Sequence, residues 1–232
     1  MDQAISSKAA AGARAAALVA DGMHLGLGTG STVSHFLDAL AGRVRAEGLK
    51  VSGVPTSEAT ATRARELGLA ITSLDEVQVL DLVVDGADEV DLEFRLVKGG
   101  GGALLREKIV AAAGKRVAII VGEGKRVARL GTTFLLPVEI LPFGHRVTTA
   151  KVAACGCLPF LRRTEGDRPF VTDNGNWILD CKFAEGIEKP EALHAQVSQI
   201  PGVAEIGLFL GLCDVLIVGG HDGQAKIYQK NA

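Results

Sequence analysis

Residues 23–47 read MHLGLGTGSTVSHFLDALAGRVRAE, and this stretch decides the fold. It begins with a short apolar strand at 23–27, which runs into the glycine-rich turn Gly28-Thr29-Gly30-Ser31-Thr32. From residue 33 to 47 the apolar residues recur at helical spacing and share one face, formed by Phe36, Leu37, Leu40 and Val44. A strand that leads into a helix through a glycine turn is the repeating unit of an α/β domain.

The segments on either side continue this alternation of strand and helix. They are a helix at 8–20, a strand at 51–55, a helix at 57–67, an apolar strand at 80–84, a helix at 103–113 and a strand at 116–121. Aromatic residues make up only 4% of the chain, so the core must consist mainly of aliphatic residues, as in buried parallel strands. We therefore predict an α/β fold with a Rossmann-like, mostly parallel sheet and helices on both faces.

The regular alternation of strand and helix ends at about residue 132. The segments expected beyond it are a strand at 135–141, a helix at 145–154, two strands at 170–173 and 176–180, a helix at 190–199 and a strand at 203–210. Asn174-Gly175 is a strong signal for a type I′ hairpin. The order β-α-β-β-α-β predicts an inserted ferredoxin-like α+β domain at 132–208. Strands at 214–218 and 226–228 then return the chain to the large domain, 1–131 and 209–232.

The bulk properties exclude several classes of protein. The net charge is −2 and no extended run has one sign, so a nucleic-acid partner held by bulk electrostatics is not expected. No apolar run reaches the roughly 18 residues of a membrane-spanning helix, and residues 1–20 lack the pattern of a signal peptide. The cysteines show no zinc-site spacing, so we expect four reduced thiols in a cytoplasmic protein. They are Cys155, Cys157, Cys181 and Cys213.

The turn at 28–32 is a candidate anion site. Backbone N–H groups and the helix dipole favour an anion at such a junction, and Ser31 and Thr32 add hydroxyl donors. A simple capped turn is the plainer alternative. A dinucleotide loop fits badly because the third glycine of its pattern would fall at Ser31, and a Walker loop would need a Lys-Ser or Lys-Thr pair after the glycines. The phosphate of a small ligand fits best.

A second candidate, Asp85-Gly86-Ala87-Asp88-Glu89, follows directly after the apolar strand at 80–84. Ligands of open α/β sheets bind outside the carboxyl ends of the strands. Three carboxylates within five residues repel one another, an arrangement that is common where acid–base chemistry takes place. The alternatives are a solvated turn, a helix cap or a divalent metal site, which no further acidic pattern supports.

A third candidate is Lys98, followed by four glycines at 99–102 that lead into the helix at 103–113. Consecutive glycines at a helix start cost backbone entropy, so stability alone does not explain them. They are explained where the backbone must touch a ligand. A fourth and weaker candidate is Lys125, which follows the strand at 116–121 and is in reach of a phosphate unless it is an ordinary surface lysine. Lys8 has a weaker claim still.

Glu107 is the most informative single residue. At helical spacing its neighbours are Ala103, Leu104, Val110 and Ala111, so it lies on an apolar face that should be buried. A solvated surface glutamate would be the usual finding on a helix. A buried glutamate beside a glycine loop can act as a general base in a proton transfer.

Taken together, these segments resemble ribose-5-phosphate isomerase of the A type, over nearly the whole chain. The matching stretches are Gly28-Thr29-Gly30-Ser31-Thr32, Asp85-Gly86-Ala87-Asp88-Glu89, Lys98-Gly99-Gly100-Gly101 with Arg106-Glu107-Lys108, Pro137-Val138-Glu139, and Thr172-Asp173-Asn174-Gly175-Asn176. Five matches in order are far more specific than any single glycine loop. The resemblance implies interconversion of ribose 5-phosphate and ribulose 5-phosphate in the non-oxidative pentose phosphate pathway, without metal or nucleotide cofactor.

The resemblance also implies roles for individual residues. Glu107 matches the proton-transferring base, and Asp85, Asp88 and Lys98 match further catalytic positions. The substrate-contacting positions are Thr29, Gly30, Ser31, Thr32, Gly86, Ala87, Gly99, Gly100, Gly101 and Lys125. One departure is Glu123, two residues before Lys125, where smaller polar residues are expected. The family's ferredoxin-like domain takes part in subunit contacts, which implies a homodimer or homotetramer.

Two other functions compete with this one. A non-catalytic sugar-phosphate sensor would keep the phosphate loop but would not need Glu107 on an apolar face, and it commonly carries a DNA-binding helix pair, for which the residues before Leu25 are too few. A related enzyme, such as a CoA transferase or an amino-sugar-phosphate deaminase, would be separated from an isomerase by its substrate.

Overall fold

The chain forms two compact units. The computed structural model describes residues 2–230, with side chains from Ser7 onward. The first unit comprises the described residues up to Ala87, residues 106–125, and the described residues from Gly211 on. The second unit comprises residues 88–105 and 126–210.

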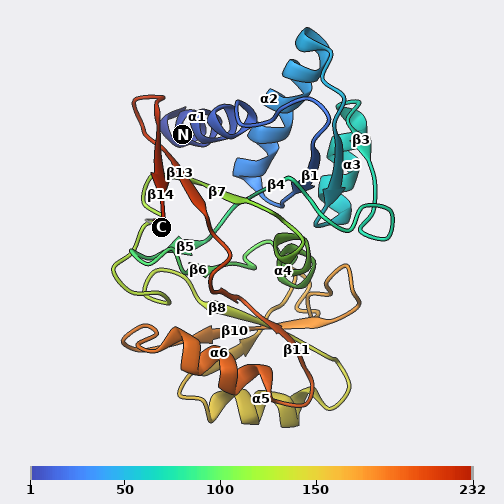
Figure 1. The fold of residues 1–232 in the computed structure, drawn as a ribbon. Helices are drawn as coiled ribbons and strands as arrows, with labels where there is room; N and C mark the ends of the chain where they lie inside the picture. Colours follow the sequence, from blue (N-terminus) through green and yellow to red (C-terminus); the bar gives the residue numbers. More distant parts are fainter. Residues whose placement is uncertain (1, 231–232) are drawn as a thin grey trace. The chain divides into compact units, whose positions relative to one another are not determined.

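A seven-stranded sheet forms the centre of the first unit (Figure 1). Its strand order is β14-β13-β7-β4-β1-β2-β3, and every neighbouring pair is parallel except β13 and β14. The strands are β1 (His24–Leu27), β2 (Ser52–Pro55), β3 (Ala70–Ile71), β4 (Leu82–Asp85), β7 (Val117–Gly122), β13 (Val215–Gly219) and β14 (Ala225–Gln229). The mostly parallel sheet predicted from the sequence is therefore confirmed.

The strand order reverses between β1 and β4. From β1 the chain continues outward to β2 and β3, whereas from β4 it continues in the other direction to β7 and β13. At such a switch point the connecting segments leave in opposite directions, which opens a crevice outside the carboxyl ends of the two strands. The turn after β1 and the aspartate that ends β4 both lie at this switch point.

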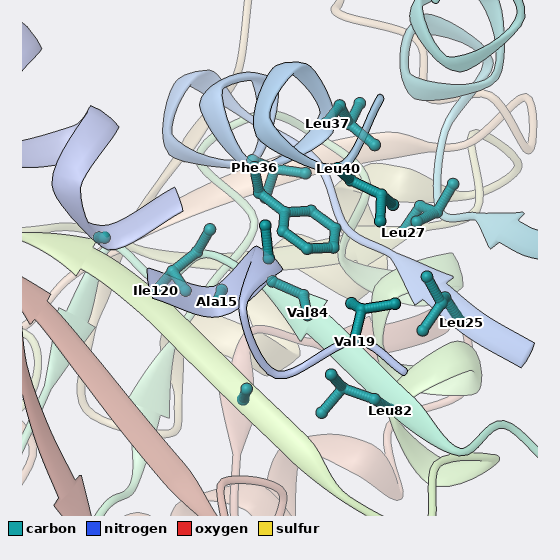
Figure 2. Packing of buried hydrophobic residues seen from close by; sticks show 14 of the residues in the cluster. Ala15, Val19, Leu25, Leu27, Phe36, Leu37, Leu40, Leu82, Val84 and Ile120 are labelled. Atoms are coloured by element: carbon teal, nitrogen blue, oxygen red, sulfur yellow. The ribbon is translucent and has the colours of Figure 1, made fainter. Parts of the chain in front are cut away.

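Helices cover both faces of the sheet, as expected. They are α1 (Asp2–Ala16), α2 (Ser31–Glu47), α3 (Glu58–Glu66) and α4 (Leu104–Ala112), of which α4 begins in the second unit. Phe36 and Leu40 of α2 pack onto Leu27, Val84 and other apolar side chains of the sheet (Figure 2). The alternate residues of these strands point to the opposite face, because side chains alternate along a strand.

On that opposite face, Gly26 of β1 lets α4 approach the sheet. A Cβ atom at Gly26 would lie 2.7 Å from Cγ1 of Val110 and 2.8 Å from Cγ2 of Val83. A side chain of any size at this position would therefore push α4 away from the strand. Because α4 carries Glu107, the glycine also fixes the depth at which that glutamate lies.

The second unit contains a four-stranded antiparallel sheet of order β11-β8-β10-β9. Its elements along the chain are β8 (Leu136–Ile140), α5 (His145–Ala153), β9 (Leu158–Leu161), β10 (Trp177–Lys182), α6 (Pro190–Ser198) and β11 (Val203–Ile206). Leu136, Val138 and Ile140 of β8 are buried in its core together with apolar residues of the helices. The connectivity β-α-β-β-α-β with the fourth strand beside the first is the predicted ferredoxin-like arrangement.

The predicted hairpin around Asn174-Gly175 is wrong in detail. The partners of β10 are β8 and β9, and residues 170–173 belong to the long loop between β9 and β10. Gly175 has a φ of 77°, but Asn174 does not have the positive φ that a type I′ turn requires at its first central residue. The Thr172 hydroxyl accepts backbone N–H groups of Asn174 at 3.3 Å and Asn176 at 3.2 Å, and this local bonding replaces the hairpin geometry.

The division into units differs from the predicted single insertion at 132–208. Residues 88–105 group with the second unit because a small sheet of order β12-β6-β5 ties them to its last strand. Its strands are β5 (Glu89–Val90), β6 (Leu96–Val97) and β12 (Leu208–Phe209). In addition, the N–H of Val127 donates to the carbonyl of Val90 at 2.9 Å. Two-residue strands are too short to show a periodic pattern in the sequence, so they were not predicted.

Two glycines of the first unit give a test of this packing. Gly26→Ala should destabilise the protein by about 1–3 kcal/mol, because its methyl group has no room against Val83 and Val110. Gly42→Ala, within α2 and with no atom within 4 Å of the new Cβ, should instead stabilise it by about 0.5–1 kcal/mol. Urea unfolding of both variants measures the two effects, and equal shifts would contradict this account.

Candidate active site

The turn after β1 holds the carboxylate of Asp85 in place. Oδ1 of Asp85 accepts the N–H of Thr29 at 3.1 Å and the N–H of Gly86 at 2.7 Å. Gly28 donates its own N–H to the carbonyl of Val84 at 2.9 Å, so the turn is tied directly to β4. A Cβ atom at Gly28 would lie 2.1 Å from Asp85 Oδ1. Only glycine therefore lets this buried carboxylate lie against the turn.

Thr29 belongs to a cluster of hydroxyl groups that sequence analysis missed. Its Oγ1 lies 2.7 Å from Oγ1 of Thr56, 2.8 Å from Oγ of Ser57 and 3.3 Å from Oγ1 of Thr60. Thr60 in turn donates to the carbonyl of Gly28 at 2.8 Å. The available signal was the position of Thr56 and Ser57 directly after β2, whose carboxyl end lies at the same edge as that of β1. These hydroxyls fix the side chain of Thr29 at the crevice.

The amino end of α2 carries the features of an anion site. Gly30 is the N-cap residue and has a φ of 111°, a conformation that side chains disfavour. Ser31 and Thr32 form the first turn, where backbone N–H groups point out of the helix. Nζ of Lys8 on α1 donates to Oγ of Ser31 at 2.9 Å. A cation, a helix dipole and exposed N–H groups thus meet at the amino end of α2. Lys8, the weakest candidate in the sequence, lies at this end of the helix.

The turn that contains Lys125 follows β7 close to Lys8. A Cβ atom at Gly122 would lie 2.9 Å from Oγ of Ser7 and 3.6 Å from Cγ of Lys8, so α1 lies against the end of β7. Oε2 of Glu123 accepts the N–H of His221 at 3.2 Å. The acidic residue that departs from the expected pattern is therefore engaged by the turn between β13 and β14. Lys125 itself is half-buried.

Glu107 lies where its helical spacing predicts. It is only 5% exposed, and its neighbours Ala103, Leu104, Val110 and Ala111 are all buried as well. The preceding residue, Arg106, points elsewhere and pairs with Glu58 at 2.9 Å. The burial of a carboxylate on an apolar helix face is costly, and it is typical of groups that take part in chemistry.

In the second unit, Asp88 is bound to the glycine loop. Its Oδ2 accepts the N–H of Gly100 at 2.8 Å, and its own N–H donates to the carbonyl of Val97 at 2.8 Å. A Cβ atom at Gly100 would lie 2.6 Å from Asp88 Oδ1, so a side chain there would displace the carboxylate. Asp88 and the glycine loop, both predicted to contact the ligand, are therefore bonded directly to each other.

Lys98 is buried at the start of this loop. It is 2% exposed, its N–H donates to the carbonyl of Gly207 at 2.9 Å, and its Nζ lies 5.3 Å from the centre of the Phe209 ring. A buried ammonium group over an aromatic ring is held by a cation–π interaction. The next residue, Gly99, is closely packed, because a Cβ atom there would lie 3.1 Å from the Pro137 side chain.

The third carboxylate of the acidic cluster, Glu89, has a structural role. It is fully buried, and its oxygens accept the N–H groups of Gly131 and Thr133 at 2.5 Å, of Phe134 at 2.8 Å, and the Thr133 hydroxyl at 2.7 Å. Four donors hold this side chain within the second unit. Of the three neighbouring carboxylates, only Asp85 and Asp88 therefore remain as candidates for catalysis.

Two further matching stretches of the sequence meet in the second unit. Oε1 of Glu139 on β8 accepts the hydroxyl of Thr172 at 2.9 Å and the side-chain amides of Asn174 at 3.1 Å and Asn176 at 3.0 Å. Glu139 is fully buried. The two stretches thus form one hydrogen-bonded cluster that fixes the loop before β10.

The predicted site residues fall into two sets, one in each unit. The first unit contains Thr29, Gly30, Ser31, Thr32, Asp85, Gly86, Ala87, Glu107 and Lys125, and the second contains Asp88, Lys98, Gly99, Gly100 and Gly101. Within residues 2–230, no group of three His, Cys, Asp or Glu side chains is arranged to hold a metal ion. None of the helices within the same range is long and apolar enough to cross a membrane.

The four cysteines are free thiols. Cys155 and Cys157 are half-buried, and Cys181 and Cys213 are buried. Burial raises the pKa of the Cys213 thiol to about 12, so this side chain stays protonated at neutral pH.

Comparisons with known proteins place the chain in one family. A family model for ribose 5-phosphate isomerase A (phosphoriboisomerase A) matches residues 52–223. The ribose-5-phosphate isomerase A of Methanoregula boonei is 47% identical over 228 residues, which cover 97% of this chain and 94% of that protein. The structure of ribose 5-phosphate isomerase A from Methanocaldococcus jannaschii has a TM-score of 0.91 at 37% identity, with 96% and 98% covered. A D-ribose-5-phosphate isomerase in complex with phospho-erythronic acid has a TM-score of 0.92 at 35% identity, with 96% and 97% covered.

The structural role of Glu89 can be tested by stability. Glu89→Gln removes the charge that its four donors share and puts an amide N–H₂ among them, so we expect a loss of about 2 kcal/mol or more in the free energy of unfolding. Glu93→Gln changes an exposed glutamate nearby and should stay within about 0.5 kcal/mol of the parent protein. If urea unfolding gave the same small change for both, Glu89 would not have this role.

Proposed function

This chain belongs to the ribose 5-phosphate isomerase A family and interconverts D-ribose 5-phosphate and D-ribulose 5-phosphate through an enediol(ate), and we propose that Glu107 is the base that moves the proton. The observation that carries this assignment is a carboxylate, 5% exposed, on a wholly apolar helix face. In the open-chain aldose the C2 proton is acidic because the neighbouring aldehyde stabilises the resulting anion. Glu107 removes this proton and returns it to C1, which yields the ketose.

Lys98 and the glycine loop stabilise the charge that develops in this step. As the C2 proton leaves, negative charge grows on the oxygen of the former aldehyde. The buried ammonium of Lys98, with the N–H groups of Gly99 and Gly101, is suited to receive that charge, because donors that are fixed before the reaction need no reorganisation. Phospho-erythronic acid, bound by a related isomerase, has a planar carboxylate on a phosphorylated four-carbon chain and so resembles this intermediate.

Asp85 and Asp88 hold the sugar hydroxyls and pass protons between O1 and O2. One oxygen of each carboxylate is anchored by backbone N–H groups, Asp85 by those of Thr29 and Gly86 and Asp88 by that of Gly100. Anchored carboxylates keep their direction while a proton moves, which favours transfer between neighbouring oxygens. The same two groups assist the opening of the furanose ring, which must precede the proton transfer.

The phosphate of the substrate binds at the amino end of α2. The N–H groups beyond Gly30, the hydroxyls of Ser31 and Thr32, and the ammonium groups of Lys8 and Lys125 supply its donors. Thr29, Gly86 and Ala87 line the crevice between this end and the carboxylates. The sugar then extends from the end of β1 to the end of β4, along the reversal of strand order.

The protein is proposed to act in the cytoplasm as a homodimer or homotetramer, without metal or nucleotide. Several large apolar side chains of the second unit are exposed, and such residues commonly lie in subunit contacts. They include Phe143, Val147, Leu158 and Phe160. The composition and charge of the chain offer no basis for binding nucleic acid.

Replacing the proposed base tests the mechanism directly. Glu107→Gln keeps the size of the side chain but cannot take up a proton, so kcat for ribose 5-phosphate isomerisation should fall by about 10²–10⁴-fold. KM and the unfolding midpoint should change little. Glu66→Gln, at an exposed glutamate of α3, serves as the matched control and should leave kcat unchanged. Near-normal turnover of Glu107→Gln would refute the assignment.

The phosphate end is tested by Lys8→Met. Loss of a charged donor beside Ser31 should raise KM for ribose 5-phosphate about tenfold or more, with a smaller effect on kcat. The inhibition constant of inorganic phosphate should rise in parallel, because the same groups bind it. Lys50→Met, an exposed lysine at the opposite ends of the strands, should change neither constant. An unchanged inhibition constant for Lys8→Met would place the phosphate elsewhere.

A further inference from the structure

The glycine loop is held from behind by an arginine that no part of the mechanism has used. Arg162 follows β9 in the second unit, and its Nη1 donates to the carbonyl of Gly99 at 2.9 Å and to that of Gly100 at 3.1 Å. Both contacts go to main-chain oxygens of the segment proposed to stabilise the enediolate. The two acceptor oxygens belong to the backbone, so their positions are set by the conformation of the loop and not by side chains.

The guanidinium of Arg162 is itself fixed on its other edge. Its Nε donates to Oδ2 of Asp180 at 2.9 Å, and its Nη2 donates to Oδ1 of the same residue at 2.5 Å. Asp180 lies on β10, within the antiparallel sheet. The Phe170 ring lies 5.7 Å from Cζ of Arg162 and adds a cation–π contact. With side-chain exposures of 14% for Arg162 and 19% for Asp180, the pair is largely shielded from solvent.

This arrangement needs the planar fork of an arginine. Two edges of one guanidinium serve two purposes, one toward the carboxylate and one toward the carbonyls. A lysine ammonium is a point charge with a single nitrogen and cannot span both. The contact therefore has the chemistry of a specific clamp on the loop.

The clamp determines where the N–H groups of the loop point. In a trans peptide the C=O of one residue and the N–H of the next lie in one plane and point in opposite directions. When Arg162 holds the carbonyls of Gly99 and Gly100, the N–H groups of Gly100 and Gly101 are directed away from it. The N–H of Gly100 does meet Oδ2 of Asp88 at 2.8 Å, on the far side of that peptide.

Without such a clamp the loop would have many conformations. Gly99 and Gly102 both have positive φ values, 106° and 80°, and glycine residues have the greatest backbone freedom. A cationic donor on each carbonyl also polarises the peptide and strengthens the opposite N–H as a donor. The orientation of the loop N–H groups and their strength as donors both determine how well they stabilise the oxygen that becomes negatively charged.

We propose that Arg162, held by Asp180, is a positioning residue for the isomerisation, which fixes the Gly100 and Gly101 N–H groups and, through Gly100, the carboxylate of Asp88. It touches no reacting atom. This inference rests on the proposed function, in which the glycine loop receives the charge of the enediolate. The alternative is that the Arg162–Asp180 pair only stabilises the fold of the second unit.

The test compares Arg162→Lys, Arg162→Met and Asp180→Asn with a matched control at the next residue. Arg163→Met removes a 47% exposed arginine, whose side chain bonds locally to the carbonyl and carboxylate of Asp167. For each variant, kcat and KM are measured with ribose 5-phosphate, and binding constants are measured for inorganic phosphate and for phospho-erythronate. Urea unfolding establishes that each variant is folded under assay conditions.

We expect kcat of the Arg162 variants to fall about 10- to 100-fold, since loss of one fixed donor in an oxyanion site costs about 10²–10³-fold. Affinity for phospho-erythronate should fall by a similar factor, while affinity for inorganic phosphate and KM stay within about threefold. Asp180→Asn should show the same pattern more weakly. Adding Asp180→Asn to Arg162→Met should have little further effect, because both changes act through one guanidinium. Arg163→Met should behave as the parent protein.

The possible failures are distinguishable. If folded Arg162→Lys retains the parent kcat and the parent preference for phospho-erythronate over phosphate, the positioning role is wrong. If all constants change together with the folded fraction, the pair is only structural. If the parent protein itself binds phospho-erythronate no better than phosphate, the proposed role of the loop fails before Arg162 is considered. Should Arg162→Met not fold, the milder Arg162→Lys and Asp180→Asn carry the test.

Discussion

The proposed site depends on the absence of a side chain at Gly28. A single carbon atom there would lie 2.1 Å from Asp85 Oδ1, so no other residue allows the end of β4 and the turn after β1 to meet. Because they meet, the N–H of Thr29 reaches the carboxylate, and the same turn brings Gly30 to the start of α2. The anion site and the acidic group are thereby fixed at a constant separation within one unit. The reversal of strand order separates the connecting segments at the ends of β1 and β4, and Gly28 lets the turn after β1 lie against Asp85 there.

Carboxylates take the place of regular structure in the loops. Asp88, Glu89, Glu139 and Asp180 each bind donors from segments that have no long strand or helix of their own. A loop with few apolar side chains cannot be held by packing, so charged hydrogen bonds supply its order. Glu89, Glu139 and Asp180 thus hold the backbone around the proposed site, whereas Asp88 both binds the glycine loop and is proposed to act on the substrate.

The sequence was informative where the relevant geometry is local. Glu107 and its four apolar neighbours are set by helical spacing alone, and the structure confirms their burial. Lys8 bonds Ser31 across 23 residues and Arg162 bonds Gly99 across 63, and no periodic pattern predicts such distant pairs. The type I′ turn at Asn174 failed for a similar reason, since the Thr172 hydroxyl that accepts the N–H groups of Asn174 and Asn176 is itself bound to the distant Glu139.

The order of elements along the chain has a consequence for biosynthesis. The first helix, α1, packs against β13, and a Cβ atom at Gly219 would lie 1.7 Å from the carbonyl oxygen of Ser7. Helix α1 therefore leaves the ribosome well before β13, the strand on which it docks, has been made. Strands β1, β2 and β4 can pair before β13 is made, but the surface on which α1 packs is incomplete until β13 emerges. Contacts of such long sequence separation slow folding and leave apolar helix surface exposed to chaperones in the meantime.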